Sequence, residues 1–218
     1  MAPSDSCVCS IPLEQLQDAE DLCFEALHMD REMVMDQFDD IFEDATERCN
    51  GSLECKGMYK SFPISAIEGN EVRVGDVSFV SEAFANALRC ADELVIYAVT
   101  VHGYEELVKN PDNDPFDNMF FDAWGVAYAM SSHRWIKAAI LEQASAKGRH
   151  VGRGWVPGEG GLEMSLQRDL FDLLGPSAIG ISLPESGLMH PMMSISGFMG
   201  VSDNPEIEGI GKDIVSQH

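Results

Sequence analysis

The chain has 218 residues, of which 45% are hydrophobic, and its mean hydropathy is −0.08. These values predict one sizeable soluble core or at most two small domains, and no apolar run approaches the roughly 20 residues that a membrane-spanning helix needs. The formal net charge of −23 argues against nucleic acids and anionic membranes as partners, because both are themselves negatively charged.

The N-terminal residues and the cysteines indicate the cellular compartment. The first residues lack the basic and then apolar regions of a signal peptide, so we expect a cytoplasmic protein. Its six cysteines include no C-x-x-C pair and are expected to be reduced. Cys7 and Cys9 could bind a soft metal, but free thiols are the favoured interpretation, and we predict no metal site.

Composition divides the chain into three parts. We expect residues 1–11 to form a flexible N-terminal arm and residues 12–202 to form one domain. Residues 203–218, which are punctuated by proline and glycine, are expected to form a loose C-terminal tail.

Two helices are predicted at the start of the domain. Pro12 suits the first turn of a helix that runs to about His28, and Asp30 is the expected N-cap of a helix that runs to about Cys49. Residues 14–48 contain thirteen acidic and two basic side chains. A solvated acidic face is the favoured interpretation, and a docking surface for a basic protein or a cationic ligand is the alternative.

The middle of the chain alternates between strands and helices. The apolar run from Glu93 to Val101 predicts a central strand that is buried on both faces. Asn110–Pro115 is a strong turn signal. The other predicted elements are strands at 58–64 and 71–74, a helix to Ala91 opened by Ser78 or Ser81, a short helical turn at 103–108, a long helix at 116–146, a strand at 149–155, a helix at 162–174, and strands at 179–183 and 193–201.

Three motifs in the last third of the chain follow one another in a distinctive order. They are Trp155-Val-Pro-Gly-Glu-Gly-Gly161, then Leu183-Pro-Glu-Ser-Gly-Leu-Met-His-Pro191 after a helix with a Leu-Leu pair, and then Ser194-Ile-Ser-Gly197. This order resembles the S-adenosylmethionine-binding activation domain of cobalamin-dependent methionine synthase, and most closely its free-standing homologues. The family pattern is Arg-x-x-Pro-Gly-Tyr, Leu-Thr-Glu-Ser-x-x-Met-x-Pro and Ser-Val-Ser-Gly.

The resemblance also bears on the fold. Alternating strands and helices alone would permit a doubly wound α/β fold. The resemblance, which extends over about residues 20–201, implies instead a single α+β domain with a curved, largely antiparallel sheet flanked by helices.

The resemblance implies a ligand site at the glycine-rich turn, where the backbone can approach a ligand closely. Glu185 and Ser186 are expected beside this turn, as a wall of the cleft or as a structural turn. The predicted S-adenosylmethionine contacts are Arg153, Val156, Pro157, Gly158, Glu159, Gly160, Glu185 and Ser186.

The turn departs from the family pattern at two positions. Gly154 occupies the family arginine position, and Glu159 occupies the tyrosine position. Arg153 is one residue too early, and a shift of one residue along a strand turns a side chain to the opposite face. A glutamate that the family carries on the long helix falls near Met130. These changes predict weakened, altered or lost ligand binding.

Two histidines are candidates for a role in catalysis or in ligand binding. His102 is a general-base candidate only in principle, because a lone histidine after a strand is usually structural. His190 lies in Met189-His-Pro-Met-Met193, where Cu(I) binding or contact with a corrinoid is a minor alternative to packing.

The resemblance implies a corrinoid-system protein that binds S-adenosylmethionine and presents it to a separate cobalamin-carrying methyltransferase or corrinoid protein for remethylation. Cobalamin would reach the site only through that partner, a reductase would supply electrons, and no catalytic residue is expected in this chain. The alternative is a non-catalytic module that keeps the scaffold but not the ligand and that docks onto or regulates a corrinoid methyltransferase.

Overall fold

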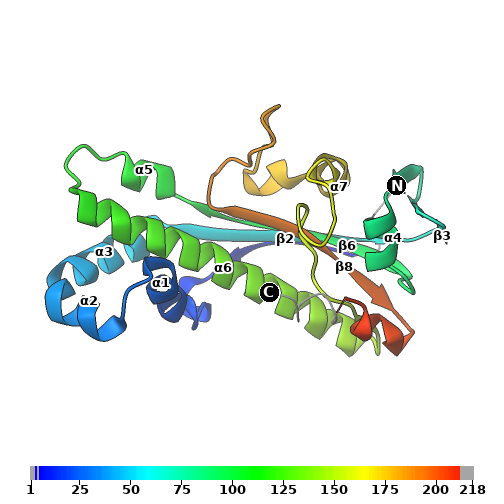
Figure 1. The fold of residues 1–218 in the computed structure, drawn as a ribbon, viewed down its shortest axis with the longest axis horizontal. Helices are drawn as coiled ribbons and strands as arrows, with labels where there is room; N and C mark the ends of the chain where they lie inside the picture. Colours follow the sequence, from blue (N-terminus) through cyan, green and yellow to red (C-terminus); the bar gives the residue numbers. More distant parts are fainter. Residues whose placement is uncertain (1–2, 4, 212–218) are drawn as a thin grey trace.

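The computed structural model describes residue 3 and residues 5–211. Its main sheet is curved and antiparallel and is flanked by helices, which confirms the predicted α+β class (Figure 1). In spatial order the main sheet contains β1 (Asp5–Ile11), β2 (Glu54–Pro63), β6 (Glu93–His102), β8 (Ser194–Ser202) and β7 (His150–Val151). A small second sheet contains β3 (Ala66–Glu68), β4 (Glu71–Val74) and β5 (Val77–Val80).

Strand β6 is the centre of the main sheet, as its apolar sequence predicted. It pairs with β2 on one side and with β8 on the other. Its side chains alternate between two hydrophobic clusters, so that Tyr97 and Val99 face one cluster while Ile96 and Ala98 face the other. The sheet therefore has a core on each face.

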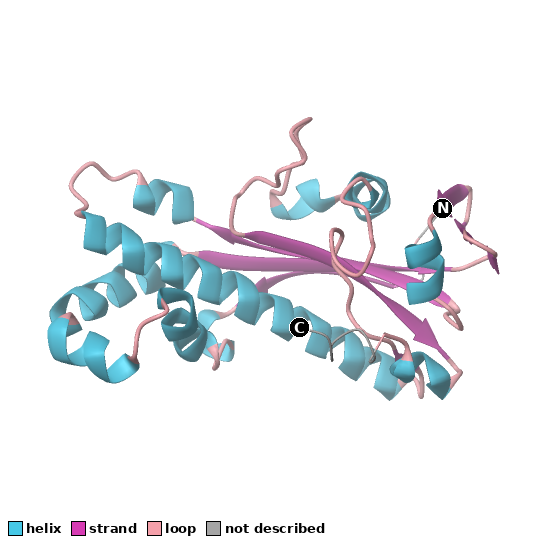
Figure 2. Ribbon diagram, in the orientation of Figure 1, coloured by secondary structure: helices cyan, strands magenta, loops and turns pink. Residues whose placement is uncertain are grey.

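Helices cover the first face, which contains Tyr97. The 32-residue helix α6 runs diagonally along this face, with α1 and α3 packed beside it (Figure 2). Its Gly125 allows the ring of Tyr104 to approach, because a Cβ there would lie 2.9 Å from Tyr104 Cδ2. The helices on this face are α1 (Ala19–Leu27), α2 (Arg31–Gln37), α3 (Asp39–Ser52) and α6 (Pro115–Ala146), preceded by the 3-10 turn η1 (Leu13–Gln15). Helix α5 (Tyr104–Val108) contacts α3 and α6.

Shorter elements cover the second face. They are α4 (Glu82–Ala87), α7 (Leu166–Leu174), and the 3-10 turns η2 (Pro176–Ile179) and η3 (Pro205–Gly209). Their apolar residues, among them Phe84, Leu170 and Ile207, pack together with Trp155 and Phe198. None of the helices in the described part of the chain has the length and apolarity needed to cross a membrane.

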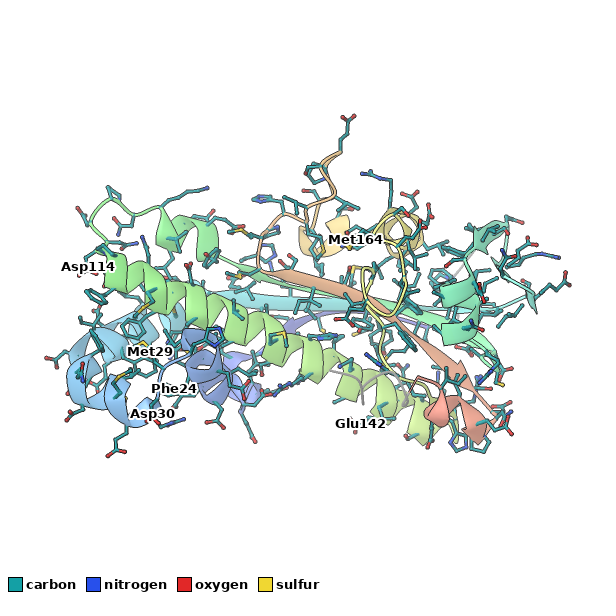
Figure 3. All side chains as sticks on the ribbon, viewed as in Figure 1. Phe24, Met29, Asp30, Asp114, Glu142 and Met164 are labelled. Carbon is teal, nitrogen blue, oxygen red and sulfur yellow. The ribbon has the colours of Figure 1, made fainter. Side chains whose placement is uncertain are left out.

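Two helices begin at the aspartates that the sequence predicted or marked as turn residues (Figure 3). Asp30 accepts a hydrogen bond from Glu32 N at 2.8 Å. Asp114 accepts hydrogen bonds from Phe116 N and Asp117 N, and the Asp114 backbone N–H donates to the Asp117 carboxylate, which completes a capping box.

The role of Asp114 at the start of α6 can be tested by mutation. We expect Asp114→Ala to lower the free energy of unfolding by about 1 kcal/mol, because two backbone N–H groups lose their acceptor. Asp112→Ala removes the same charge from the same exposed loop and should change stability by less than about 0.5 kcal/mol. Equal losses in urea unfolding of the two variants would contradict the capping role.

The structure corrects predictions about the two ends of the chain, one helix and one strand. Residues 5–11 form β1, paired with β2 over its whole length, rather than a flexible arm. The predicted helix at 30–49 is two helices that meet at Phe38. Residues 179–183 form the end of η2 and a single bridge, not a strand. Residues 203–211 are ordered by η3 and by Ile207, which is fully buried, while the rest of the predicted tail, residues 212–218, lies outside the described residues.

Candidate functional site

The glycine-rich turn is held against the edge of the main sheet by backbone hydrogen bonds. Gly152 N donates to Gly200 O, and Trp155 and Phe198 exchange two hydrogen bonds, all at 2.9 Å. After this short pairing the chain turns back, and Gly158 N donates to Leu162 O at 2.9 Å. The turn is therefore a fixed extension of the sheet rather than a free loop.

Gly158 has a backbone conformation that only glycine adopts easily. Its φ is +96°, and a Cβ there would lie 2.6 Å from Met164 Sδ. Met164 lies beside this turn (Figure 3). Gly158 and Glu159 are both exposed, so the outer side of the turn is open to a ligand.

Successive side chains of this segment point to opposite sides, as the one-residue-shift argument predicted. The guanidinium of Arg153 lies 4.8 Å from the ring centre of Trp155 and donates to Gly211 O at 3.3 Å. Gly154 faces the other way, toward α6, where its Cβ would lie 3.0 Å from Lys137 Cδ. Arg153 therefore does not occupy the side that Gly154 faces.

A polar cluster fills the space that Gly154 leaves open. Tyr97 Oη lies 3.3 Å from the Cβ position of Gly154 and forms a 2.9 Å hydrogen bond with His133 Nε2. The rings of Tyr97 and His133 stack with their centres 5.5 Å apart. Lys137 lies one turn further along α6. We refer to Tyr97, His133 and Lys137 as the α6 cluster.

Burial and neighbouring charges shift the pKa of each group in the α6 cluster. Burial, reinforced by Lys137 and Arg134, lowers the pKa of His133 to about 4, so the imidazole is neutral at pH 7. Burial also lowers the pKa of Lys137, with a further contribution from nearby arginines, while Glu159 opposes this change. Burial and then Glu159 raise the pKa of Tyr97, so its hydroxyl keeps its proton.

A separate cavity of about 890 Å³ lies on the opposite side of the segment. Its walls include Trp155, Gly160 and Gly161 from the turn, and Arg89 and Asp169 from the elements that cover the second face. The turn thus has two different surroundings, the α6 cluster on one side and this cavity on the other.

No protein-family model and no curated protein matches the chain. Among solved structures, the crystal structure of the MetH reactivation domain bound to AdoHcy matches with a TM-score of 0.69, covering 90% of this chain and 78% of that chain at 15% identity. The fold is that of the MetH reactivation domain. At this identity the match establishes the fold alone.

Within the reactivation-domain fold, the predicted site residues fall into two groups. Arg153, Val156, Pro157, Gly158, Glu159 and Gly160 lie together in one turn. Glu185 and Ser186 lie in an exposed loop that protrudes from the top of the molecule in Figure 1, away from this turn. Arg168 donates to Pro184 O of that loop at 3.2 Å, and the role of Glu185 and Ser186 stays a prediction.

The sequence interpretation missed the α6 cluster. Tyr97 was assigned only to a buried strand, and His133 and Lys137 only to a long helix. The sequence feature that could have pointed to Tyr97 is Gly197. A Cβ at that position would lie 2.5 Å from Trp155 O and closer still to Tyr97 Oη. The glycine of the Ser-Ile-Ser-Gly motif therefore makes room for the tyrosine hydroxyl.

The remaining candidates have structural surroundings. His102 Nε2 hydrogen-bonds Ile179 O at 2.8 Å, which fits a structural role. Burial, with a contribution from Cys7, raises the pKa of Cys9 to about 11, so this thiol is a poor metal ligand at neutral pH. Within the described part of the chain, no group of three His, Cys, Asp or Glu side chains is arranged to hold a metal ion.

Proposed function

We propose that the outer side of the Arg153–Gly161 turn, facing α6, binds an S-adenosyl ligand, either S-adenosylmethionine or S-adenosylhomocysteine. The observation that carries this proposal is the fold, because the MetH reactivation domain that shares it was crystallised with AdoHcy. The exposed Gly158, which follows the buried Pro157, and the nearby polar side chains are consistent with a small polar ligand.

The proposed role of the chain is to present this ligand to a separate cobalamin-carrying protein. Methyl transfer from S-adenosylmethionine to reduced cobalamin is chemistry of the two cofactors, so the chain would contribute position and exclusion of water. The neutral His133 and the protonated Tyr97 suit such a role, since they offer hydrogen bonds without adding charge beside the ligand.

Glu159 adds a negative charge to this site. Its carboxylate acts electrostatically on both Tyr97 and Lys137. A carboxylate there favours the sulfonium of S-adenosylmethionine over the neutral sulfur of S-adenosylhomocysteine.

Thermal unfolding with S-adenosylmethionine tests both the ligand and its side of the turn. A ligand at 100 times its dissociation constant stabilises a protein by about 2.7 kcal/mol. We expect Glu159→Lys to lose most of this stabilisation, because it places a cation near the sulfonium. Glu163→Lys makes the same charge change at an exposed residue that lines the cavity, and it should keep the stabilisation.

The outcomes separate three arrangements. Loss in the Glu159 variant alone supports the α6 side of the turn. Loss in the Glu163 variant alone would move the ligand to the cavity and contradict the proposed side. No stabilisation of the unaltered chain would contradict ligand binding itself.

A second candidate function is a docking module that has kept the scaffold but lost the ligand. The observation that favours it is Gly154, whose missing side chain leaves space that Lys137 already fills. The acidic surface of α2 and α3 would then be the contact surface for a basic region of a corrinoid methyltransferase.

A further inference from the structure

The side chain of Lys137 lies across the position that a side chain at residue 154 would occupy. The Cβ position of Gly154 is 3.0 Å from Lys137 Cδ and 3.9 Å from Lys137 Nζ. The lysine stem therefore packs against the backbone of the turn and brings its ammonium group to the side that Tyr97 Oη also faces, where the charge of Glu159 acts on it. Residue 137 is only partly exposed, so this position is defined by packing and not by a free surface chain.

This ammonium group makes no hydrogen bond or ion pair with any residue in the described ranges. The contrast with its neighbours is clear, because Arg134 on the same helix pairs with Asp18 at 2.7 Å, and Lys147 pairs with Asp5. The chain carries 37 acidic and 14 basic residues, so carboxylate partners are abundant. Because Lys137 is half-buried and has no carboxylate partner, its N–H donors are available to an acceptor from outside the chain.

The electrostatic surroundings of Lys137 favour an anion. Arg134 and Arg153 both repel its positive charge, and Glu159 alone attracts it without forming an ion pair. An added carboxylate at Nζ would relieve this repulsion and satisfy the ammonium donors. His133 and Tyr97 are neutral at pH 7, so the charge contrast at this point comes from the lysine.

We propose that Lys137 Nζ binds the α-carboxylate of the S-adenosyl ligand. This inference rests on the proposed function, since the homocysteine end of such a ligand carries both a carboxylate and an ammonium group. The carboxylate pairs with Lys137, and the cationic groups of the ligand, its ammonium group and the sulfonium of S-adenosylmethionine, lie toward Glu159. The cation that holds the ligand thus comes from α6 instead of from residue 154 of the turn.

The test compares two ligands that differ only in the carboxylate. Isothermal titration calorimetry is run with S-adenosylhomocysteine and with its decarboxylated analogue, 5′-(3-aminopropylthio)-5′-deoxyadenosine. The variant is Lys137→Met, which keeps an unbranched apolar stem beside Gly154 and removes the charge. Arg134→Met is the matched control, since it removes the same charge from the same helix at a residue that already has a partner.

We expect Lys137→Met to weaken S-adenosylhomocysteine binding about tenfold or more and to change binding of the analogue by less than about twofold. Lys137→Arg should restore most of the affinity, and Arg134→Met should leave it within about twofold. Equal weakening of both ligands, or no weakening of either, would overturn the assignment of Lys137 and leave the proposed function standing. Failure of both ligands to bind the folded, unaltered chain would overturn the proposed function and this inference with it.

Discussion

Replacing Gly197 with alanine is expected to lower the free energy of unfolding by about 3 kcal/mol, at the upper end of the usual cost of overpacking. A Cβ at this position would lie 2.5 Å from Trp155 O and closer still to Tyr97 Oη. Neither neighbour can move without loss, because Trp155 is paired through its backbone with Phe198 and Tyr97 is fully buried. The added methyl group would therefore push the ligand turn away from the sheet.

The control for this prediction is Gly51→Ala. Gly51 lies in the last turn of α3, and nothing lies within 4 Å of its Cβ position. Urea unfolding should show little change or a small gain in stability for this variant. Equal stability of Gly197→Ala and Gly51→Ala would contradict the claim that the turn packs closely on Tyr97 at Gly197.

Acidification is expected to destabilise the protein partly through His133. The pKa of this imidazole is about 4 in the folded protein, against 6.5 for the unperturbed group. Between these pH values the unfolded chain binds a proton that the folded chain does not, so the stability contribution is complete above pH 6.5 and is lost as the pH falls toward 4. The full shift corresponds to about 3 kcal/mol, and partial exposure reduces our expectation to about 2 kcal/mol.

The measurement is the free energy of unfolding at pH 7 and at pH 4.5 for the unaltered chain and for His133→Gln. Glutamine cannot titrate, so the variant should lose about 2 kcal/mol less on acidification. His190→Gln is the control, because the side chain of His190 is 67% exposed. A His133 variant with the same pH dependence as the unaltered chain would show that the imidazole is not held neutral by burial.

The fold could be predicted where the sequence pattern and the burial agree. The apolar run at Glu93–Val101 has no polar alternation, and it is the strand that is covered on both faces. The long helix was predicted to within one residue of its observed start, because the Asn110–Pro115 turn signal precedes its apolar residues.

The pattern failed where tertiary contacts supply the order. Residues 5–11 are a short segment with exposed side chains at alternate positions up to Ser10, and they form a strand because β2 offers an edge that pairs along their whole length. Ile207 holds the segment around η3 by filling space above Gly152 and Gly200, and no local sequence pattern around residue 207 predicts this contact.

Part of the candidate site could be predicted from the sequence, and part could not. Alternation along a strand was sufficient to predict that Arg153 and Gly154 face opposite sides. The position of Lys137 could not be predicted, because its contact with Gly154 depends on how α6 crosses the edge of the sheet. Periodicity places Lys137 on a face of a helix, but it does not say which segment that face meets.

Isothermal titration calorimetry of the purified chain with S-adenosylmethionine tests the central claim most directly. The account predicts binding of one ligand per chain in the micromolar range without any partner protein, and loss of this binding in Gly158→Trp, which fills the turn. Circular dichroism must show that both proteins are folded. Absence of heat from the folded, unaltered chain at millimolar ligand would contradict the account and leave the docking module as the function that the fold supports.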